Sequence, residues 1–174
     1  MGGFNPATKT GERAVSDAID QAAGLTPEEA LYQTRRLRPE FVEGAEACRL
    51  SVLTPEDEQG LPADLRLALA QRMAVLNDDV PLQRDYQAQL AALNPSEALL
   101  ALAAGDVVNE EPLATLARHT DLVTQQPIQA TEQHIRLLEQ AGLTNPQIVA
   151  LSELIAFVNF QTRVAAGLRL MRSA

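Results

Sequence analysis

The sequence has little of several residue types on which many sites depend. Its 174 residues include one cysteine, two histidines and no tryptophan, and aromatic residues make up only 3%. A single cysteine, Cys48, excludes a disulfide within the chain and any metal site built from clustered cysteines. Two histidines are too few for a histidine-rich metal centre, so neither a metal nor a cofactor is expected. The scarcity of valine, isoleucine and aromatic residues also disfavours a β-sheet.

Basic residues are scarce as well. There are 14 of them against 23 acidic residues, which gives a formal net charge of −9. Such a charge repels phosphate groups, so neither nucleic acid nor a membrane is expected as a partner. The longest apolar run, residues 148–160, is interrupted by Ser152 and Glu153 and is shorter than the roughly 20 residues of a membrane span. The first residues contain no signal-peptide core, and a cytoplasmic location is expected.

Helix-start signals are abundant. Residues 26–29, 94–97 and 144–147 each combine a capping side chain, a proline and a Glu or Gln three residues after the cap. The intervening segments consist mainly of good helix formers, which predicts an all-α chain. We expect a flexible N-terminus at residues 1–16 and a single domain at residues 17–174. Helices are expected near residues 12–23, 27–36, 39–53, 62–77, 81–93, 95–104, 111–124, 130–141 and 145–171, with an acidic linker at 54–60.

Two of these helices resemble each other. Residues 61–77 (LPADLRLALAQRMAVLN) align without a gap to residues 143–159 (LTNPQIVALSELIAFVN), and both segments end in asparagine. Gly60 and Gly142 precede the two segments, and each is expected to end the previous helix in the left-handed conformation. A repeat at a long period predicts two related helical lobes. The alternative is chance similarity between two amphipathic helices.

The second half of the chain resembles a known family. The segments that carry the resemblance are residues 113–119 (LATLARH), 135–143 (IRLLEQAGL) and 148–168, within which FVNFQTRVA at 157–165 is the most specific. They are similar to the AhpD-like superfamily, which contains alkylhydroperoxidases and carboxymuconolactone decarboxylase (CMD) domains, in its peroxidase-related branch. Residues 17–25 and 61–77 add to this resemblance. It implies a helical fold with related halves and homo-oligomers (dimer, trimer or hexamer). A companion peroxidase-like protein is a further candidate partner.

The chain departs from the family at the catalytic motif. Active members carry Cys-x-x-Cys at a helix start, a histidine after it and a glutamate one helix earlier, because a thiolate attacks the peroxide and a second thiol resolves it. With Asn77 as the anchor, the two cysteine positions hold Asp79 and Leu82. Tyr86 stands at the histidine position, and the glutamate position falls near Leu67. Thiol peroxidase chemistry of the family type is therefore not expected.

Polar residues replace that motif. Asp78, Asp79, Arg84 and Tyr86 follow one helix and begin the next, where the family keeps its active site. They are candidates for a ligand-binding pocket. The alternative is that Asp78 or Asp79 caps the helix that opens near Pro81, because aspartate is favoured at helix starts.

Cys48 and the histidines are further candidates. Cys48 is expected to be buried or inert, since the only cations near it in sequence are Arg38 and Arg49; the alternative is a lone peroxidatic thiol. His119 and His134 are expected at the surface or at helix ends. They could act as an acid and base pair if the fold brought them together.

The last helix is expected to mediate association. Arg163, one turn after Asn159, is expected to link lobes or subunits through a charge-assisted bond, with ligand anchoring as the alternative. An apolar stripe on the same helix is too large for one small lobe to cover, which favours self-association. The stripe consists of Val149, Leu154, Phe157 and Phe160.

Three functions follow from these observations. The first is a catalytically degenerate binding or accessory protein related to peroxide defence. The second is a non-redox enzyme of the carboxymuconolactone decarboxylase type, acting through the pocket of Asp78, Asp79, Arg84 and Tyr86. The third is alkylhydroperoxidase-like activity through Cys48 alone.

Overall fold

The computed structural model describes residues 17–174, and the expected flexible segment 1–16 lies outside the described residues. The described part is helical and contains no strand, which confirms the all-α prediction. One short 3-10 helix, η1, spans Pro127–Gln129. The α-helices are α1 (Ala18–Ala23), α2 (Ala30–Arg35), α3 (Pro39–Leu53), α4 (Ala63–Leu76), α5 (Val80–Ala91), α6 (Glu97–Ala104), α7 (Leu113–Gln125), α8 (Glu132–Gln140) and α9 (Asn145–Ser173).

The start of α9 follows the predicted capping pattern. Thr144 is the N-cap, and its backbone N–H donates to the side-chain oxygen of Gln147 at 2.8 Å in a complete capping box. Gly142 precedes it with φ of +95°, as expected for a residue that ends a helix in the left-handed conformation. Gly60 also has a positive φ, +75°, but it ends a turn rather than a helix because α3 already stops at Leu53.

Two other helix starts differ from the prediction. α6 is capped by Ser96, whose hydroxyl accepts from the N–H of Leu99 at 3.3 Å, while Asn94 lies in a turn with φ of +52°. α2 begins only at Ala30, because residues 27 and 28 form a turn that the carboxylate of Glu29 closes by accepting from a backbone N–H at 2.6 Å. At the start of α2, a side chain that bonds the nearby backbone in a turn competes with the helix.

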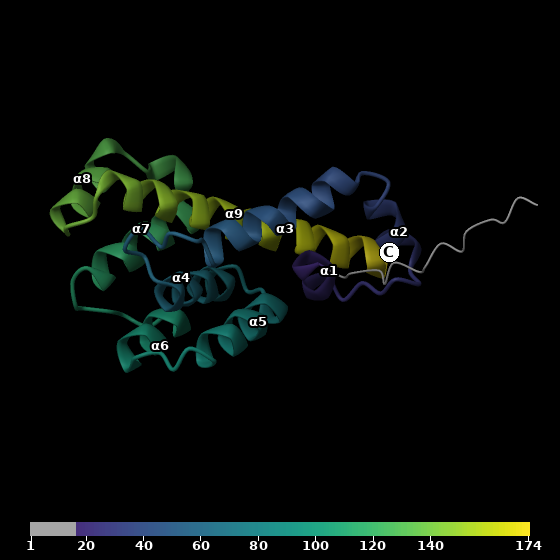
Figure 1. The fold of residues 1–174 in the computed structure, drawn as a ribbon, viewed down its shortest axis with the longest axis horizontal. Coiled ribbons are helices and arrows are strands. Elements are labelled where there is room, and N and C mark those ends of the chain that lie inside the picture. The colour runs from purple at the N-terminus through teal and green to yellow at the C-terminus, as the bar shows by residue number, and fades with distance from the viewer. Residues whose placement is uncertain (1–16) are drawn as a thin grey trace, which may run out of the picture.

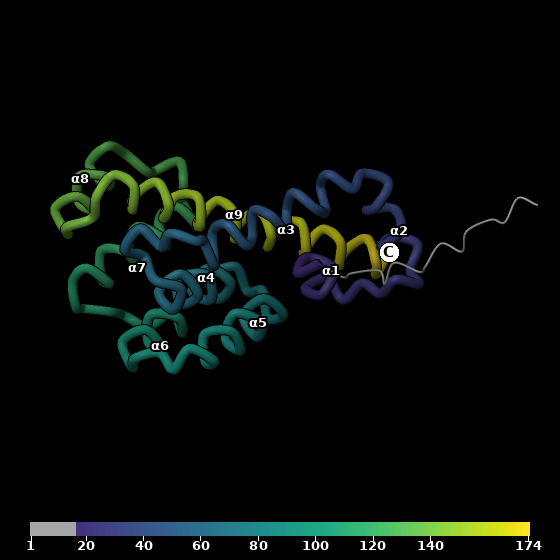
Figure 2. The backbone as a smooth tube through the Cα atoms, viewed as in Figure 1, coloured from purple at the N-terminus to yellow at the C-terminus, as the bar shows by residue number. Residues whose placement is uncertain are grey.

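α9 is the longest element and organises the rest (Figure 1). α4 to α8 gather around its N-terminal half, and α1 and α2 lie beside its C-terminal half. α3 runs alongside α9 in the opposite direction between these two groups, as the backbone trace also shows (Figure 2). The α3–α9 pair therefore spans the junction of the two groups.

The hydrophobic core consists of two clusters that share α9. In the larger cluster α4 is central, and Ala68, Leu69, Ala70, Met73 and Ala74 are fully buried because neighbouring helices cover it on several sides. Small alanine side chains let these helices approach closely. The smaller cluster joins α1 and α2 to α9, and its members are Ile19, Ala23, Leu25, Tyr32 and Leu168.

The equivalent asparagines of the two similar segments meet in the core. The side-chain N–H of Asn77, after α4, donates to the side-chain oxygen of Asn159 on α9 at 3.1 Å. Asn159 is buried and donates in turn to the hydroxyl of Thr124 at 3.2 Å and to the carbonyl of Ile155 at 2.9 Å. These bonds satisfy a buried amide and connect α4, α7 and α9. The two-lobe repeat itself stays a prediction.

The apolar character of α9 reflects its place in the core. Among the described residues, α9 is the one helix long and apolar enough to cross a membrane, and 61% of its most apolar window is buried inside the protein. Burial of this kind is typical of core helices. Leu154 and Phe157 of the predicted stripe are buried, whereas Val149 and Phe160 remain 56% and 42% exposed. Only part of the stripe is therefore open to a partner.

Candidate functional site

The four polar residues predicted to form a pocket are not brought together around a cavity. Asp79 and Tyr86 are buried, and Asp78 and Arg84 are exposed. None of the four lines any of the cavities described below. Asp78 occupies the turn between α4 and α5 with φ of +53°, a conformation that aspartate tolerates better than most residues. A ligand-binding role of these residues stays a prediction.

Asp79 serves the structure in two ways. It is the N-cap of α5, and its carboxylate accepts from the N–H of Leu82 at 3.2 Å. The same carboxylate accepts from the guanidinium of Arg169 on α9 at 2.7 Å. Arg169 also donates to the carbonyl of Ala22 on α1 at 2.9 Å. The capping alternative is confirmed for Asp79, which in addition ties α5, α9 and α1 together.

Tyr86 is engaged within the core. Its hydroxyl donates to the side-chain oxygen of Gln161 on α9 at 2.5 Å. Burial raises the pKa of Tyr86, and the nearby Asp85 raises it further. A phenol with a raised pKa stays protonated at neutral pH, so it acts here as a hydrogen-bond donor. Leu82 and Tyr86 therefore both pack or pair inside the protein.

The two histidines share a cavity, which the sequence raised only as an alternative. His119 on α7 and His134 on α8 both line a cavity of about 330 Å³. His119 is only 7% exposed, so its expected place at the surface is wrong, and burial lowers its pKa, with a smaller effect from His134. His134 is half-buried, and its Nδ1 accepts from the N–H of Thr131 at the start of α8.

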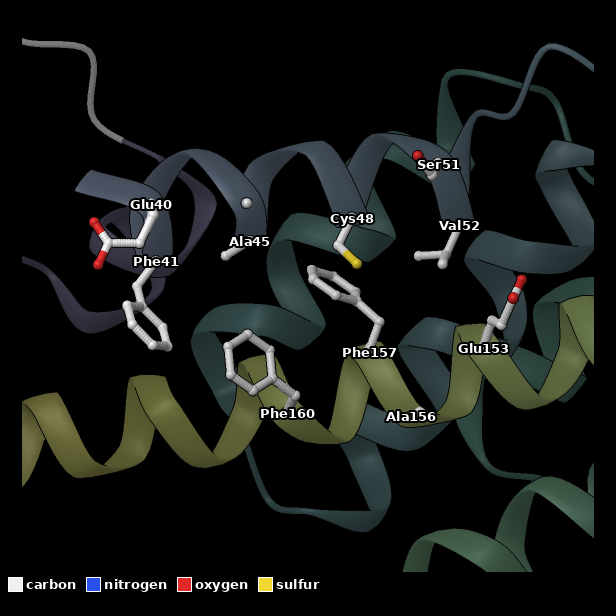
Figure 3. A pocket seen from close by; sticks show the side chains of 11 residues that line it. Glu40, Phe41, Ala45, Cys48, Ser51, Val52, Glu153, Ala156, Phe157 and Phe160 are labelled. Atoms are coloured by element: carbon white, nitrogen blue, oxygen red, sulfur yellow. The ribbon is translucent and has the colours of Figure 1, made fainter. Parts of the chain in front are cut away.

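A larger apolar groove lies between α3 and α9 (Figure 3). Its volume is about 630 Å³, within the range of ligand sites in proteins. Phe41 and Phe160, which face each other at one end, are 55% and 42% exposed. Cys48 lies on the α3 side near Phe157, and Glu40 and Glu153 lie toward opposite ends. We call this surface the α3–α9 groove.

Cys48 is exposed, so the expectation of a buried cysteine is wrong. It lies on the side of α3 that faces the open groove rather than the core. The two arginines that are near it in sequence, Arg38 and Arg49, are engaged elsewhere. Arg49 makes hydrogen bonds of 2.7 to 3.0 Å with Glu46, and these bonds raise the pKa of Arg49. The guanidinium of Arg38 lies over the ring of Phe41 at 4.1 Å.

Arg163 does not link helices within the chain. It is exposed, and the structure gives it no ion pair with a described residue. Arg169 and Arg172, further along α9, pair instead with Asp79 and Glu29 at 2.7 and 2.6 Å. Which arginine of α9 meets a carboxylate depends on where Asp79 and Glu29 pack against this helix, and the sequence pattern of α9 does not indicate that.

The groove is the feature that sequence reasoning missed. Phe41 and Phe160 lie more than 100 residues apart in the sequence, and no local pattern relates the two positions. The only signal was the exposed apolar stripe predicted for the last helix. Chemically, the groove offers apolar contact area and carboxylates near its ends, and no group of three or more metal-ligating side chains occurs in the described part of the chain.

Comparison with known proteins adds no further constraint. No family model, no curated protein and no solved structure matches this chain. The geometry of the groove and of the histidine cavity is therefore what carries a functional argument.

Proposed function

We propose that this chain is an AhpD-like protein without thiol catalysis, which acts as a binding or accessory protein related to peroxide defence. The binding surface in this proposal is the α3–α9 groove, and its occupant is an amphipathic helix of a companion protein. The observation that carries the proposal is an open apolar groove flanked by two exposed phenylalanines. Exposed apolar surface with polar residues at its rim is typical of interaction sites.

The groove has the shape and charge for a helix. It follows two helices that run side by side in opposite directions, and α3 with its 15 residues is about 22 Å long. Apolar grooves of this form bind helices that present apolar residues three and four positions apart. Glu40 and Glu153 lie near the two ends, within a chain of net charge −9, and Glu40 is only weakly paired, with Arg38 at 3.5 Å in an exposed ion pair. A helix with basic residues at both ends complements this surface, and a second copy of this acidic chain does so less well.

The residues at the positions that the resemblance aligns with the two cysteines support the loss of catalysis. Peroxidase chemistry of the family type needs two thiols one helical turn apart, and the corresponding positions hold Asp79 and Leu82. Asp79 is committed to Arg169 and to the N–H of Leu82. A cytoplasmic location belongs to the same proposal and rests on the burial of α9.

A tryptophan-containing peptide tests the groove. The probe is a synthetic helix with leucines at positions i, i+3, i+4 and i+7, one tryptophan among them and lysines at both ends. Because the chain has no tryptophan, the peptide supplies all the indole fluorescence. We expect a saturable blue shift with wild type, and binding that is weaker by about tenfold or more for Phe160→Ser, since aromatic anchors dominate such interfaces.

The matched control is Leu170→Ser, which removes an apolar side chain 73% exposed on the same helix but outside the groove. It should bind the peptide as wild type does. Equal affinity of Phe160→Ser and wild type would contradict the proposal. So would a wild-type dimer, seen by light scattering, that Phe160→Ser dissociates, because the occupant would then be a second copy of the chain.

Hydroperoxide consumption tests the absence of thiol catalysis. With tert-butyl hydroperoxide and dithiothreitol, wild type and Cys48→Ser should both give the rate of the protein-free blank. The reason is that a reactive thiol needs a nearby cation, and Arg49 and Arg38 are engaged with Glu46 and with the ring of Phe41. Turnover that disappears in Cys48→Ser would instead identify a single-cysteine peroxidase. Turnover that persists in Cys48→Ser would require catalysis by other residues and would also refute the proposal.

A further inference from the structure

A second site lies away from the groove, between α7 and α8. It is the cavity of about 330 Å³ that contains both histidines of the chain. This volume is near the lower end of the range for small-molecule sites in proteins. The residues that line it are Thr115, Arg118, His119, Leu122, His134 and Leu137.

His119 has an unused hydrogen-bonding group at this cavity. The side chain is more than nine-tenths buried, and its Nδ1 has no hydrogen-bond partner among the described residues. A buried polar atom without a partner costs stability, and buried polar groups are nearly always paired with protein, water or a ligand. The imidazole of His119 lines the cavity, and the hydrogen-bonding capacity of its Nδ1 is unmet within the described part of the chain.

The lining contains a cationic side chain although the protein is acidic. The chain carries a net charge of −9, yet the cavity lining contains one arginine, two histidines and no carboxylate. The guanidinium of Arg118 donates to the hydroxyl of Thr115 at 2.7 Å and to the carboxylate of Glu111 at 2.9 Å. The pair with Glu111 is exposed, with side chains 63% and 53% accessible, so it is weak and can be exchanged for another carboxylate.

His134 is held in a defined state by the backbone. Its Nδ1 accepts from the N–H of Thr131 at 3.0 Å in the capping box of α8. In the neutral ring the proton is therefore on Nε2, which makes that nitrogen a donor. Leu122 and Leu137 provide the apolar part of the lining.

We propose that the cavity between α7 and α8 binds a small organic acid, with its carboxylate at Arg118 and the histidines and its hydrocarbon part against Leu122 and Leu137. The guanidinium provides a charge-assisted hydrogen bond, which is stronger than a neutral one. The leucines give affinity for an apolar body that a simple inorganic anion lacks. This site is separate from the α3–α9 groove and does not depend on the function proposed for it.

Nuclear magnetic resonance of the histidine rings tests this proposal, with sodium benzoate as the probe. Only two histidines contribute ring signals, so His119 and His134 are direct reporters. We expect saturable shifts of both rings in the wild-type protein. Arg118→Gln should weaken benzoate binding by about tenfold or more, since it removes a charge-assisted bond.

Two comparisons make the result decisive. Arg136→Gln removes an arginine of similar exposure, 59%, that pairs with a glutamate on α8 outside the cavity, and it should bind benzoate like wild type. Benzyl alcohol keeps the ring but lacks the charge and should bind far more weakly. The proposal is overturned if benzoate shifts neither ring, if Arg118→Gln retains full affinity, or if benzyl alcohol binds as well as benzoate.

Discussion

Arg66→Met lowers the free energy of unfolding by about 4 kcal/mol, the largest loss we expect from a single polar substitution. Arg66 on α4 is 2% exposed and forms no ion pair with a described residue. Its guanidinium donates to the carbonyls of Leu61 at 2.6 Å, Val52 at 2.9 Å and Glu58 at 2.9 Å. These bonds attach the end of α3 and the acidic linker to α4.

The cost arises because the carbonyls of Leu61 and Val52 lose the guanidinium as a donor, whereas the carbonyl of Glu58 keeps the N–H of Leu61 at 2.9 Å. Methionine fills much of the volume of the arginine stem, so packing is largely retained. The carbonyl of Val52 lies at the end of α3, where no further helical N–H is available to it. Its bond to the guanidinium is buried, so it cannot find another partner there. Burial lowers the pKa of Arg66, whereas Glu58 and Glu153 raise it, which is the behaviour of a charge held by the fold away from water.

Urea unfolding followed by circular dichroism measures this effect. Arg163→Met is the matched control, because Arg163 is exposed on α9, and its stability should stay within about 0.5 kcal/mol of wild type. The stability of Arg66→Lys should fall between that of Arg66→Met and that of Arg163→Met. An ammonium group cannot reach three carbonyls at once as the guanidinium does. A loss below about 1 kcal/mol for Arg66→Met would show that water replaces the guanidinium at these carbonyls.

Asp79→Ala lowers the free energy of unfolding by about 3 kcal/mol. The substitution removes the N-cap of α5 and leaves the guanidinium of Arg169 without its carboxylate. Asp79 is 2% exposed and Arg169 is 32% exposed, so water compensates only part of the lost charge pair. The same pair connects α5 and α9 near α1, and its loss should also loosen α1.

Two further variants separate the cap from the charge. Asp79→Asn keeps a capping oxygen but loses the charge, so it should lose roughly half as much stability as Asp79→Ala. Asp78→Asn changes the neighbouring exposed residue, and asparagine tolerates its positive φ, so no measurable loss is expected. If Asp79→Ala and Asp78→Asn proved equally stable, Asp79 would be free for the ligand role that its sequence position suggested.

Most of the secondary structure could be predicted from the sequence. Capping residues, prolines and helix formers are local signals, and the bounds of α3 to α9 lie within about two residues of the prediction. The start of α2 was wrong because the Glu29 side chain bonds the backbone of a turn there instead of capping a helix. Such competition between a side chain and the helix cannot be judged from residue type alone.

The candidate sites were less predictable. The sequence singled out Asp79 and Tyr86, and the structure shows both engaged with α9 through Arg169 and Gln161. These partners are 75 or more residues away, so no local pattern could indicate them. The exposure of Cys48 was missed for the same reason, because it depends on the gap that α9 leaves beside α3.

The sequence by itself determined the helical class, the positions of the helices, the acidic charge and the lack of a second thiol. Each of these depends on residue type or on neighbours within a few positions, where backbone propensity and capping act. Only the tertiary structure decided which side chains share a cavity. The packing of α9 against α3 leaves an apolar groove open, and the packing of α7 beside α8 brings His119 and His134 together. Both results depend on how whole helix faces pack, which residue spacing along one helix does not specify.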